Sequence, residues 1–96
     1  MYYKFTSDIS RLGPILTPYI LEIDDNFVRF SKRNKNLINK DVTTISIDKI
    51  SSININTSIL GTTLTIYSFG NMTIIVKKMN LKDAQKAESI LNDLRQ

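Results

Sequence analysis

The stretch that decides the fold is TTISIDKISSININ, residues 43–56. Its isoleucines are separated by small polar residues or by a single Asp-Lys step, and they are Ile45, Ile47, Ile50, Ile53 and Ile55. β-branched side chains favour strands because they pack well on a pleated, half-buried surface. We therefore expect a central wall of a β structure here, with Asp48-Lys49 turning the chain between sheets and Ile50 anchoring that corner.

The segments upstream of this stretch predict a hairpin. Residues 19–23 and 28–31 alternate apolar and polar side chains, which is typical of strands with one buried face. The residues between them, 24–26 (Asp-Asp-Asn), favour a turn because Asp and Asn side chains bond their own backbone.

The downstream segments continue the β pattern. Residues 63–69 and 72–77 alternate in the same way, and Gly70-Asn71 between them predicts a two-residue type II′ turn. Together with residues 42–47 and 52–57, these segments predict six antiparallel strands in meander order.

Residues 1–14 are expected to be an N-terminal arm, and residues 15–96 a single domain. The aromatics Tyr2, Tyr3 and Phe5 fit a seventh strand, whereas the residues after them fit a helical turn that stops at Gly13-Pro14. Two roles remain open for the arm: it packs against its own domain, or it pairs with a neighbouring subunit.

The last segment, residues 80–96, changes to helical spacing. Asn80 is a favourable N-cap with Asp83 three residues on, in the position of a shortened capping box. The apolar positions recur every three or four residues, at Leu81, Ala84, Ala87, Leu91 and Leu94. The sequence therefore predicts an amphipathic C-terminal helix that covers an open end or face of the β structure, in a mainly β (α+β) domain.

The order of these segments resembles that of the bacterial pleckstrin-homology-like (PH-like) domains. The resembling pieces are ILTPYILEI, NFVRFSK, ISIDKISSINI, Gly61 ahead of TLTIYSFGNMTIIV, and NLKDAQKAESIL, which cover residues 15–95. This resemblance implies an antiparallel β-barrel, built as two roughly orthogonal sheets of six to seven strands and capped by one C-terminal helix. It also implies a binding or scaffolding role, with ring-like or dimeric self-assembly.

One feature departs from the family pattern. Lipid-binding eukaryotic members carry a basic phosphoinositide motif around the first hairpin loop, which here is the acidic Asp24-Asp25-Asn26. Phosphoinositide binding is therefore not carried over to this chain.

Composition argues against an enzyme. The chain has neither His nor Cys, which removes the usual general base, the thiol nucleophile and the commonest metal ligands. Lys49 near Ser51 and Ser52 is the only crude catalytic candidate, and a solvated turn explains the carboxylates of residues 22–25 better than a metal site does. We expect no catalytic residue, metal, cofactor or small-molecule substrate.

Two surfaces are candidates for partner binding. The first is a basic cluster that suits phosphate groups, with a solvated loop as the alternative explanation: Arg29, Lys32, Arg33, Lys35 and Lys40. The second is a set of outward β-branched and aromatic residues that suits self-association: Ile20, Ile53, Ile55, Tyr67 and Ile75.

These observations predict a non-enzymatic module that acts through protein–protein contacts as a homo-oligomer. The alternative is an electrostatic adaptor that binds nucleic acid or anionic membrane through the basic loop, as the net charge of +4 allows. The first residues lack the basic and apolar regions of a signal peptide, so we expect a cytoplasmic protein.

Overall fold

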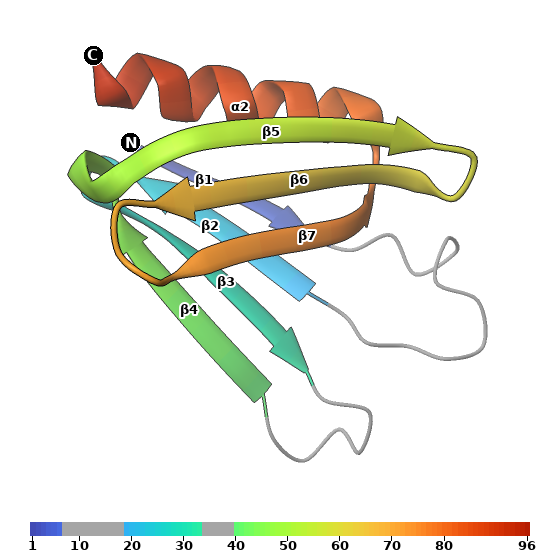
Figure 1. Cartoon of the computed structure of the whole chain (residues 1–96), viewed down its shortest axis with the longest axis horizontal. Helices are drawn as coiled ribbons and strands as arrows, with labels where there is room; N and C mark the ends of the chain where they lie inside the picture. The colour runs from blue at the N-terminus through green and yellow to red at the C-terminus, as the bar shows by residue number, and fades with distance from the viewer. Residues whose placement is uncertain (7–18, 34–39) are drawn as a thin grey trace.

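The computed structural model describes residues 1–6, 19–33 and 40–96. Its elements in chain order are β1 (Tyr2–Thr6), β2 (Tyr19–Asp24), β3 (Phe27–Arg33), β4 (Lys40–Ser46), the 3₁₀ helix η1 (Ile47–Lys49), β5 (Ile50–Ser58), β6 (Gly61–Ser68), β7 (Thr73–Met79) and α2 (Leu81–Arg95). The strands form two antiparallel sheets, which we call sheet A (β1-β2-β3-β4) and sheet B (β5-β6-β7). Figure 1 shows sheet B in front of sheet A, with α2 running along one side.

This architecture confirms the predicted mainly β domain with a C-terminal helix. The N-terminal residues form a seventh strand, because β1 pairs with β2 along its whole length. No closed barrel is found among the described strands: β4 pairs with β3 alone and β7 pairs with β6 alone, so each sheet keeps two edges. The expectation of a barrel is therefore corrected to two separate sheets.

The corner between the sheets lies where the isoleucine-rich stretch predicts it. η1 separates β4 from β5 at the Asp48-Lys49 step, and both its first residue, Ile47, and the residue that follows it, Ile50, are almost fully buried. Two backbone hydrogen bonds fix this corner: the Ile47 N–H donates to the Asn26 carbonyl at 2.9 Å, and the Phe69 N–H donates to the Lys49 carbonyl at 2.9 Å. The stretch thus joins both sheets instead of forming one wall.

The core fills the space between the two sheets. Cross-strand partners share a face of an antiparallel sheet, so Ile66 lies beside Ile53 and Ile74 on the inner face of sheet B. Sheet A contributes buried side chains from β2, β3 and β4, including Leu21, Ile23, Val28 and Ile45. These residues form one continuous hydrophobic cluster.

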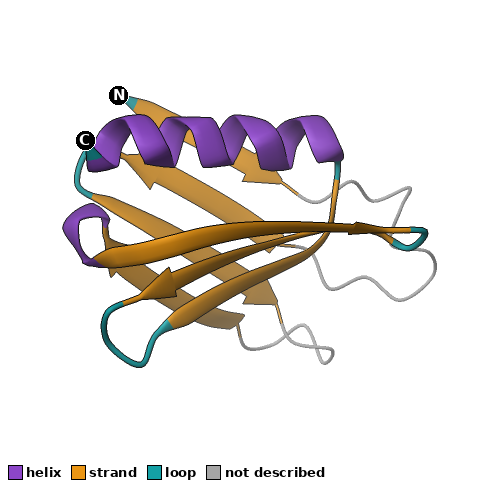
Figure 2. Cartoon of the chain, turned by 45° about the horizontal axis from the view of Figure 1, so that its top comes forward, coloured by secondary structure: helices purple, strands orange, loops and turns teal. Residues whose placement is uncertain are grey.

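The helix α2 covers one side of this core, as its apolar stripe predicts. Asn80 caps it, since its side-chain oxygen accepts the Lys82 N–H at 2.8 Å. Its buried residues Ala84, Ala87 and Leu91 face β5, β6 and η1. Figure 2 shows the helix lying across the sheets. Within the described parts of the chain, no helix combines the length and apolar character that crossing a bilayer requires.

The two hairpin turns of sheet B differ from the prediction. The Gly70-Asn71 prediction of a type II′ turn is wrong, because β6 ends at Ser68 and β7 begins only at Thr73. The glycine with positive φ in the described chain is Gly61, at +124°. The tight two-residue turn is therefore at Ile59-Leu60, between the paired residues Ser58 and Gly61.

Candidate functional site

The outer face of sheet B is a nearly uncharged surface. The register places Asn54, Thr65 and Ile75 side by side across the three strands, and the neighbouring row holds Ser52, Tyr67 and Thr73. We call this surface the sheet B face; its members are Ser52, Asn54, Asn56, Thr63, Thr65, Tyr67, Thr73, Ile75 and Lys77. Its only ionisable groups are the ammonium of Lys77 and the phenol of Tyr67.

Two large side chains stand exposed on the sheet B face. Tyr67 is 43% exposed and Ile75 is 48% exposed, although both belong to residue types that favour strands through burial. Thr65, which precedes Tyr67 by two residues on β6 and pairs with Ile75, is only 9% exposed, so neighbouring side chains cover it even on the outer surface. The face is thus a layer of side chains that are uncharged except for Lys77, with an apolar and aromatic centre.

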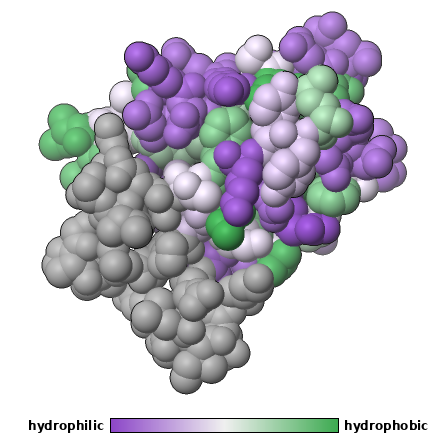
Figure 3. Space-filling model, turned by 180° about the vertical axis from the view of Figure 1, so that it is seen from behind, coloured by the Kyte–Doolittle hydropathy of each residue, from purple (hydrophilic) through white to green (hydrophobic). Residues whose placement is uncertain are grey.

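The outer face of sheet A has a different character, with charged groups engaged by neighbours. The Tyr2 hydroxyl donates to the Glu22 carboxylate at 2.5 Å, and this bond raises the pKa of Tyr2. Arg29 donates from Nε to the Thr44 hydroxyl at 3.4 Å and lies over the Phe27 ring at 4.6 Å. Figure 3 shows the molecule from this side, with hydrophilic residues interleaved with a few apolar ones.

The predicted self-association residues are not all brought together. Tyr67 and Ile75 lie on the sheet B face, as predicted. The prediction of an outer position is wrong for Ile53 and Ile55, which lie on the inner face and pack against the core. Ile20 lies on the outer face of sheet A, so it is separated from the other residues by the whole thickness of the domain.

The isoleucine pattern alone could not give the right face for Ile53 and Ile55. A bulge between Ile50 and Ser52 shifts the alternation, and the pairs Ile53–Ile66 and Ile55–Leu64 then place these side chains inward. A one-residue shift moves every later side chain to the opposite face of the sheet.

The basic residues do not form one surface where the structure describes them. Arg29 lies on the outer face of sheet A, whereas Lys32 shares the inner face with Val28 and is exposed at the end of the strand. Arg33 and Lys40 are backbone partners across β3 and β4. Lys35 and the side chains of those two residues lie outside the described part of the chain.

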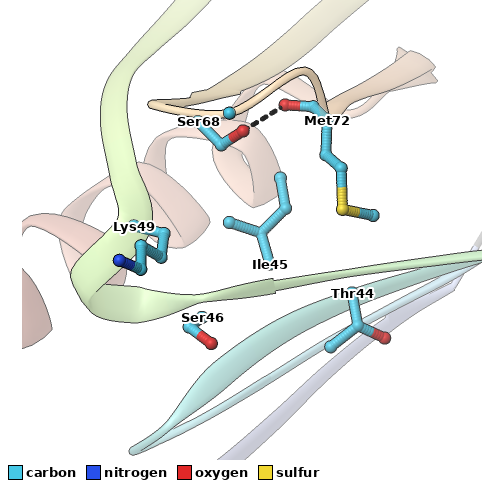
Figure 4. Close-up of a pocket in the computed structure, with 7 residues that line it drawn as sticks. Thr44, Ile45, Ser46, Lys49, Ser68 and Met72 are labelled. Carbon is cyan, nitrogen blue, oxygen red and sulfur yellow. Dashed lines mark hydrogen bonds between the residues drawn. The ribbon is translucent and has the colours of Figure 1, made fainter.

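A small hollow lies where the corner meets the β6–β7 turn. It has a volume of about 230 Å³ and is lined by Thr44, Ile45, Ser46, Lys49, Ser68, Gly70 and Met72. Figure 4 shows Ile45 pointing from β4 towards the turn, and the Lys49 ammonium pointing away from Ile45 and Met72. The Ser68 hydroxyl donates to the Met72 carbonyl at 2.6 Å, and this hydrogen bond closes the β6–β7 turn.

Lys49, the crude catalytic candidate of the sequence, lies at the corner between the two sheets. Lys49 lines this hollow with Ser46 and Ser68, and neither Ser51 nor Ser52 belongs to its lining. Across residues 1–6, 19–33 and 40–96, no group of three or more acidic side chains could hold a metal ion.

The carboxylates of residues 22–25 each have a separate partner. Glu22 accepts from Tyr2, and Asp24 accepts the N–H groups of Asn26 and Phe27 at 2.7 and 2.9 Å. Asp25 lies 3.3 Å from the N-terminal ammonium group. These contacts agree with the interpretation of the turn as solvated structure.

The exposed residues of the two sheet B turns are not among the sites predicted from the sequence. Ile59 and Leu60 are 102% and 78% exposed, and Phe69 and Met72 are 76% and 47% exposed. The sequence does contain a signal for Ile59 and Leu60, because these adjacent aliphatic residues stand in a connection where Gly, Asn or Asp is usual.

Comparison of the sequence with protein-family models and with curated protein sequences finds no match in either.

Proposed function

We propose that this domain is a non-enzymatic binding or scaffolding module of PH-like fold that self-associates through the sheet B face. The element order supports the PH-like assignment: a four-stranded and a three-stranded antiparallel sheet precede a C-terminal helix that packs on the second sheet. The absence of His and Cys from the sequence supports the non-enzymatic assignment.

The observation that carries the proposal is the nearly uncharged sheet B face with Tyr67 and Ile75 exposed at its centre. The fully buried centres of protein interfaces are depleted in charge and enriched in aromatic residues, with Tyr common among the residues that dominate affinity. An exposed β face with almost no charge is also unprotected against association, because charged side chains are the usual safeguard. A twofold contact of this face with a second copy would cover both large side chains in each protomer.

Sedimentation velocity over a range of concentrations tests the proposal. We expect wild-type protein to self-associate and Ile75→Glu to remain monomeric, because the substitution places an unpaired charge at the centre of the interface. Thr44→Glu is the matched control: it adds the same charge to an exposed outer position of sheet A, beside Arg29. Association of Ile75→Glu at wild-type concentrations, or a wild-type monomer at about millimolar concentration, would contradict the proposal.

The electrostatic alternative has less support from the geometry. Arg29 is engaged with Thr44 and Phe27, and Lys32 lies on the opposite face of the same strand. A common phosphate surface would require those cations to face the same side.

A further inference from the structure

The end of the β5–β6 hairpin carries two aliphatic side chains that stand free of the domain. Ile59 is 102% exposed, which is as much as in an extended chain, and Leu60 is 78% exposed. Neither residue type favours a tight turn, where Gly, Asn and Asp are usual because they adopt positive φ easily. The positive φ of this hairpin falls on Gly61, and the two adjacent aliphatic residues expose apolar surface to water.

The flanking residues supply the turn chemistry that the tip residues lack. The Ser58 hydroxyl accepts the Leu60 N–H at 3.2 Å and lies 3.4 Å from the Gly61 carbonyl, to which it donates. Gly61 takes the positive φ of +124° that a bulkier residue would resist. The turn is thus held from its base, and Ile59 and Leu60 remain available for contact with a partner.

A bulge places two lysines beside the base of this hairpin. Thr62 pairs with Met79 and Leu64 pairs with Val76, so Lys77 and Lys78 together oppose the single residue Thr63. Both lysines are exposed, and Lys78 has φ of +60°, which non-glycine residues adopt rarely. A Cβ at Gly61 would lie 3.2 Å from the Lys78 Cα, so the bulge is in direct contact with the hairpin base.

The start of α2 adds a third cation at the same end of the molecule. Lys82 is exposed in the first turn of the helix, and Asp83 beside it is the only acidic residue between positions 49 and 87. Figures 1 and 2 both show the β5–β6 turn projecting beyond the end of β7 and the start of α2. Among the described elements at this end, the apolar tip therefore lies beyond β7 and α2, and the three lysines are set back from it.

We infer that this end of the domain docks on an anionic lipid bilayer. Ile59 and Leu60 enter the boundary between headgroups and acyl chains, and Lys77, Lys78 and Lys82 contact the phosphates above it. In such a bilayer the hydrocarbon lies beneath a layer of negatively charged headgroups. The apolar hairpin tip, with the lysines set behind it, matches this arrangement. Lys77 also belongs to the sheet B face, whereas Ile59, Leu60, Lys78 and Lys82 lie outside it, so a variant of the tip residues leaves that face intact.

The observations favour a bilayer over a protein partner. Protein hot spots are typically Trp, Tyr or Arg seated in a pocket, and Leu is under-represented among them. The opposite end of sheet B provides an internal comparison, since Phe69 and Met72 are also exposed there. That turn borders the hollow near Lys49 and has no equivalent group of lysines from β7 and α2.

Vesicle cosedimentation tests the inference directly. The probes are phosphatidylcholine vesicles with and without about one third phosphatidylglycerol, at low and at physiological salt. We expect wild-type protein to bind only the anionic vesicles, and Ile59→Ser/Leu60→Ser to lower the partition coefficient at least about tenfold. Phe69→Ser/Met72→Ser, which removes similar apolar surface from the opposite turn, is expected to bind as wild type does.

The lysines are tested with variants of equal net charge. We expect Lys77→Gln/Lys78→Gln/Lys82→Gln to lower binding about tenfold or more, and the control Lys4→Gln/Lys32→Gln/Lys49→Gln to lower it much less. Circular dichroism confirms folding of each variant, and sedimentation velocity reports self-association separately.

Four results would overturn the inference. These are no binding of the wild type to anionic vesicles at low salt, equal binding to uncharged vesicles, retained binding by the tip variant, and equal loss from both serine double variants.

Discussion

The outer faces of the two sheets carry different chemistry although both are built on antiparallel strands of the same chain. On sheet A, Tyr2, Glu22 and Arg29 are joined to neighbours by hydrogen bonds or stacking. On sheet B, the corresponding rows hold Thr, Asn and Ser around Tyr67 and Ile75. Sheet A presents several charged groups, of which Glu22 and Arg29 are engaged by neighbours, whereas sheet B presents almost no charge to oppose contact with another protein.

The difference between these outer faces indicates which part of the β structure serves the fold and which is available for a partner. Both inner faces build the core, which includes residues from every strand of each sheet and from α2. Six exposed large apolar residues of the described chain lie on sheet B and its two turns: Ile59, Leu60, Tyr67, Phe69, Met72 and Ile75. Tyr2 and Val42 are exposed on sheet A, but Tyr2 is bonded to Glu22 there.

The largest expected effect is a difference in stability between substitutions at two adjacent residues of β6, Ile66 and Tyr67. Ile66→Ala should lower the free energy of unfolding by about 2–5 kcal/mol, because Ile66 is fully buried and its loss leaves a cavity. Tyr67→Ala should cost less than about 1 kcal/mol in the monomer but abolish self-association, because the ring faces outward. Urea unfolding at low protein concentration measures both; equal destabilisation would contradict the division between inner and outer faces.

A second prediction concerns the two turns of sheet B. Gly61→Ala should destabilise the domain by about 1–3 kcal/mol, because φ of +124° and the Lys78 Cα at 3.2 Å both oppose a Cβ. Gly70→Ala is the matched control, since its nearest neighbour atom would be 3.9 Å away and its φ is not positive. Thermal unfolding of both variants measures this difference. If Gly61→Ala were as stable as wild type, the turn that holds Ile59 and Leu60 outward would not require glycine at this position.

A smaller effect is expected on sheet A. Arg29→Ala should cost about 1 kcal/mol or less, because its contacts with Thr44 and Phe27 lie at a partly exposed surface. Self-association should remain at the wild-type level, as measured by sedimentation velocity. Loss of self-association in Arg29→Ala would show that the outer face of sheet A also contributes to self-association, which would contradict its assignment to the sheet B face.

The smallest effect is a pH dependence on sheet A. The hydrogen bond from Tyr2 to Glu22 raises the pKa of Tyr2 above its ordinary value of 10.0, so the bond stabilises the folded state below that pH. This contribution is lost as pH rises through the pKa of the folded state. Wild-type stability should therefore fall slightly more than that of Tyr2→Phe above pH 10.0.

Ultraviolet titration of the phenols gives the direct test of this bond. Glu22→Gln should bring the pKa of Tyr2 down towards its ordinary value, because the negatively charged acceptor is removed. An unchanged tyrosine titration curve in Glu22→Gln would show that the bond does not control the pKa of Tyr2.

Much of the architecture followed from local signals in the sequence. The Asp24 turn, the corner at Asp48-Lys49 and the Asn80 cap were predictable, because each depends on residues that are adjacent in the chain. The faces of Ile53 and Ile55 were not predictable, because the bulge that sets them depends on pairing with β6.

The candidate sites were predicted less completely than the fold. Tyr67 and Ile75 were identified by alternation, since their neighbours on the same strands are clearly core residues. The separation of Arg29 from Lys32 was missed because closeness in sequence does not place two strand residues on one face. The group of Lys77, Lys78 and Lys82 beside the hairpin tip depends on a bulge and a helix start, which sequence spacing alone does not bring together.

Amide hydrogen exchange at low and at high protein concentration tests most directly whether the sheet B face mediates self-association. Exchange is measured under the same buffer conditions, so that association is the only variable. The account predicts that protection rises with concentration in β5, β6 and β7, around Tyr67 and Ile75, while β1 to β4 remain unchanged. Protection that rises in sheet A instead, or that does not depend on concentration anywhere, would contradict it.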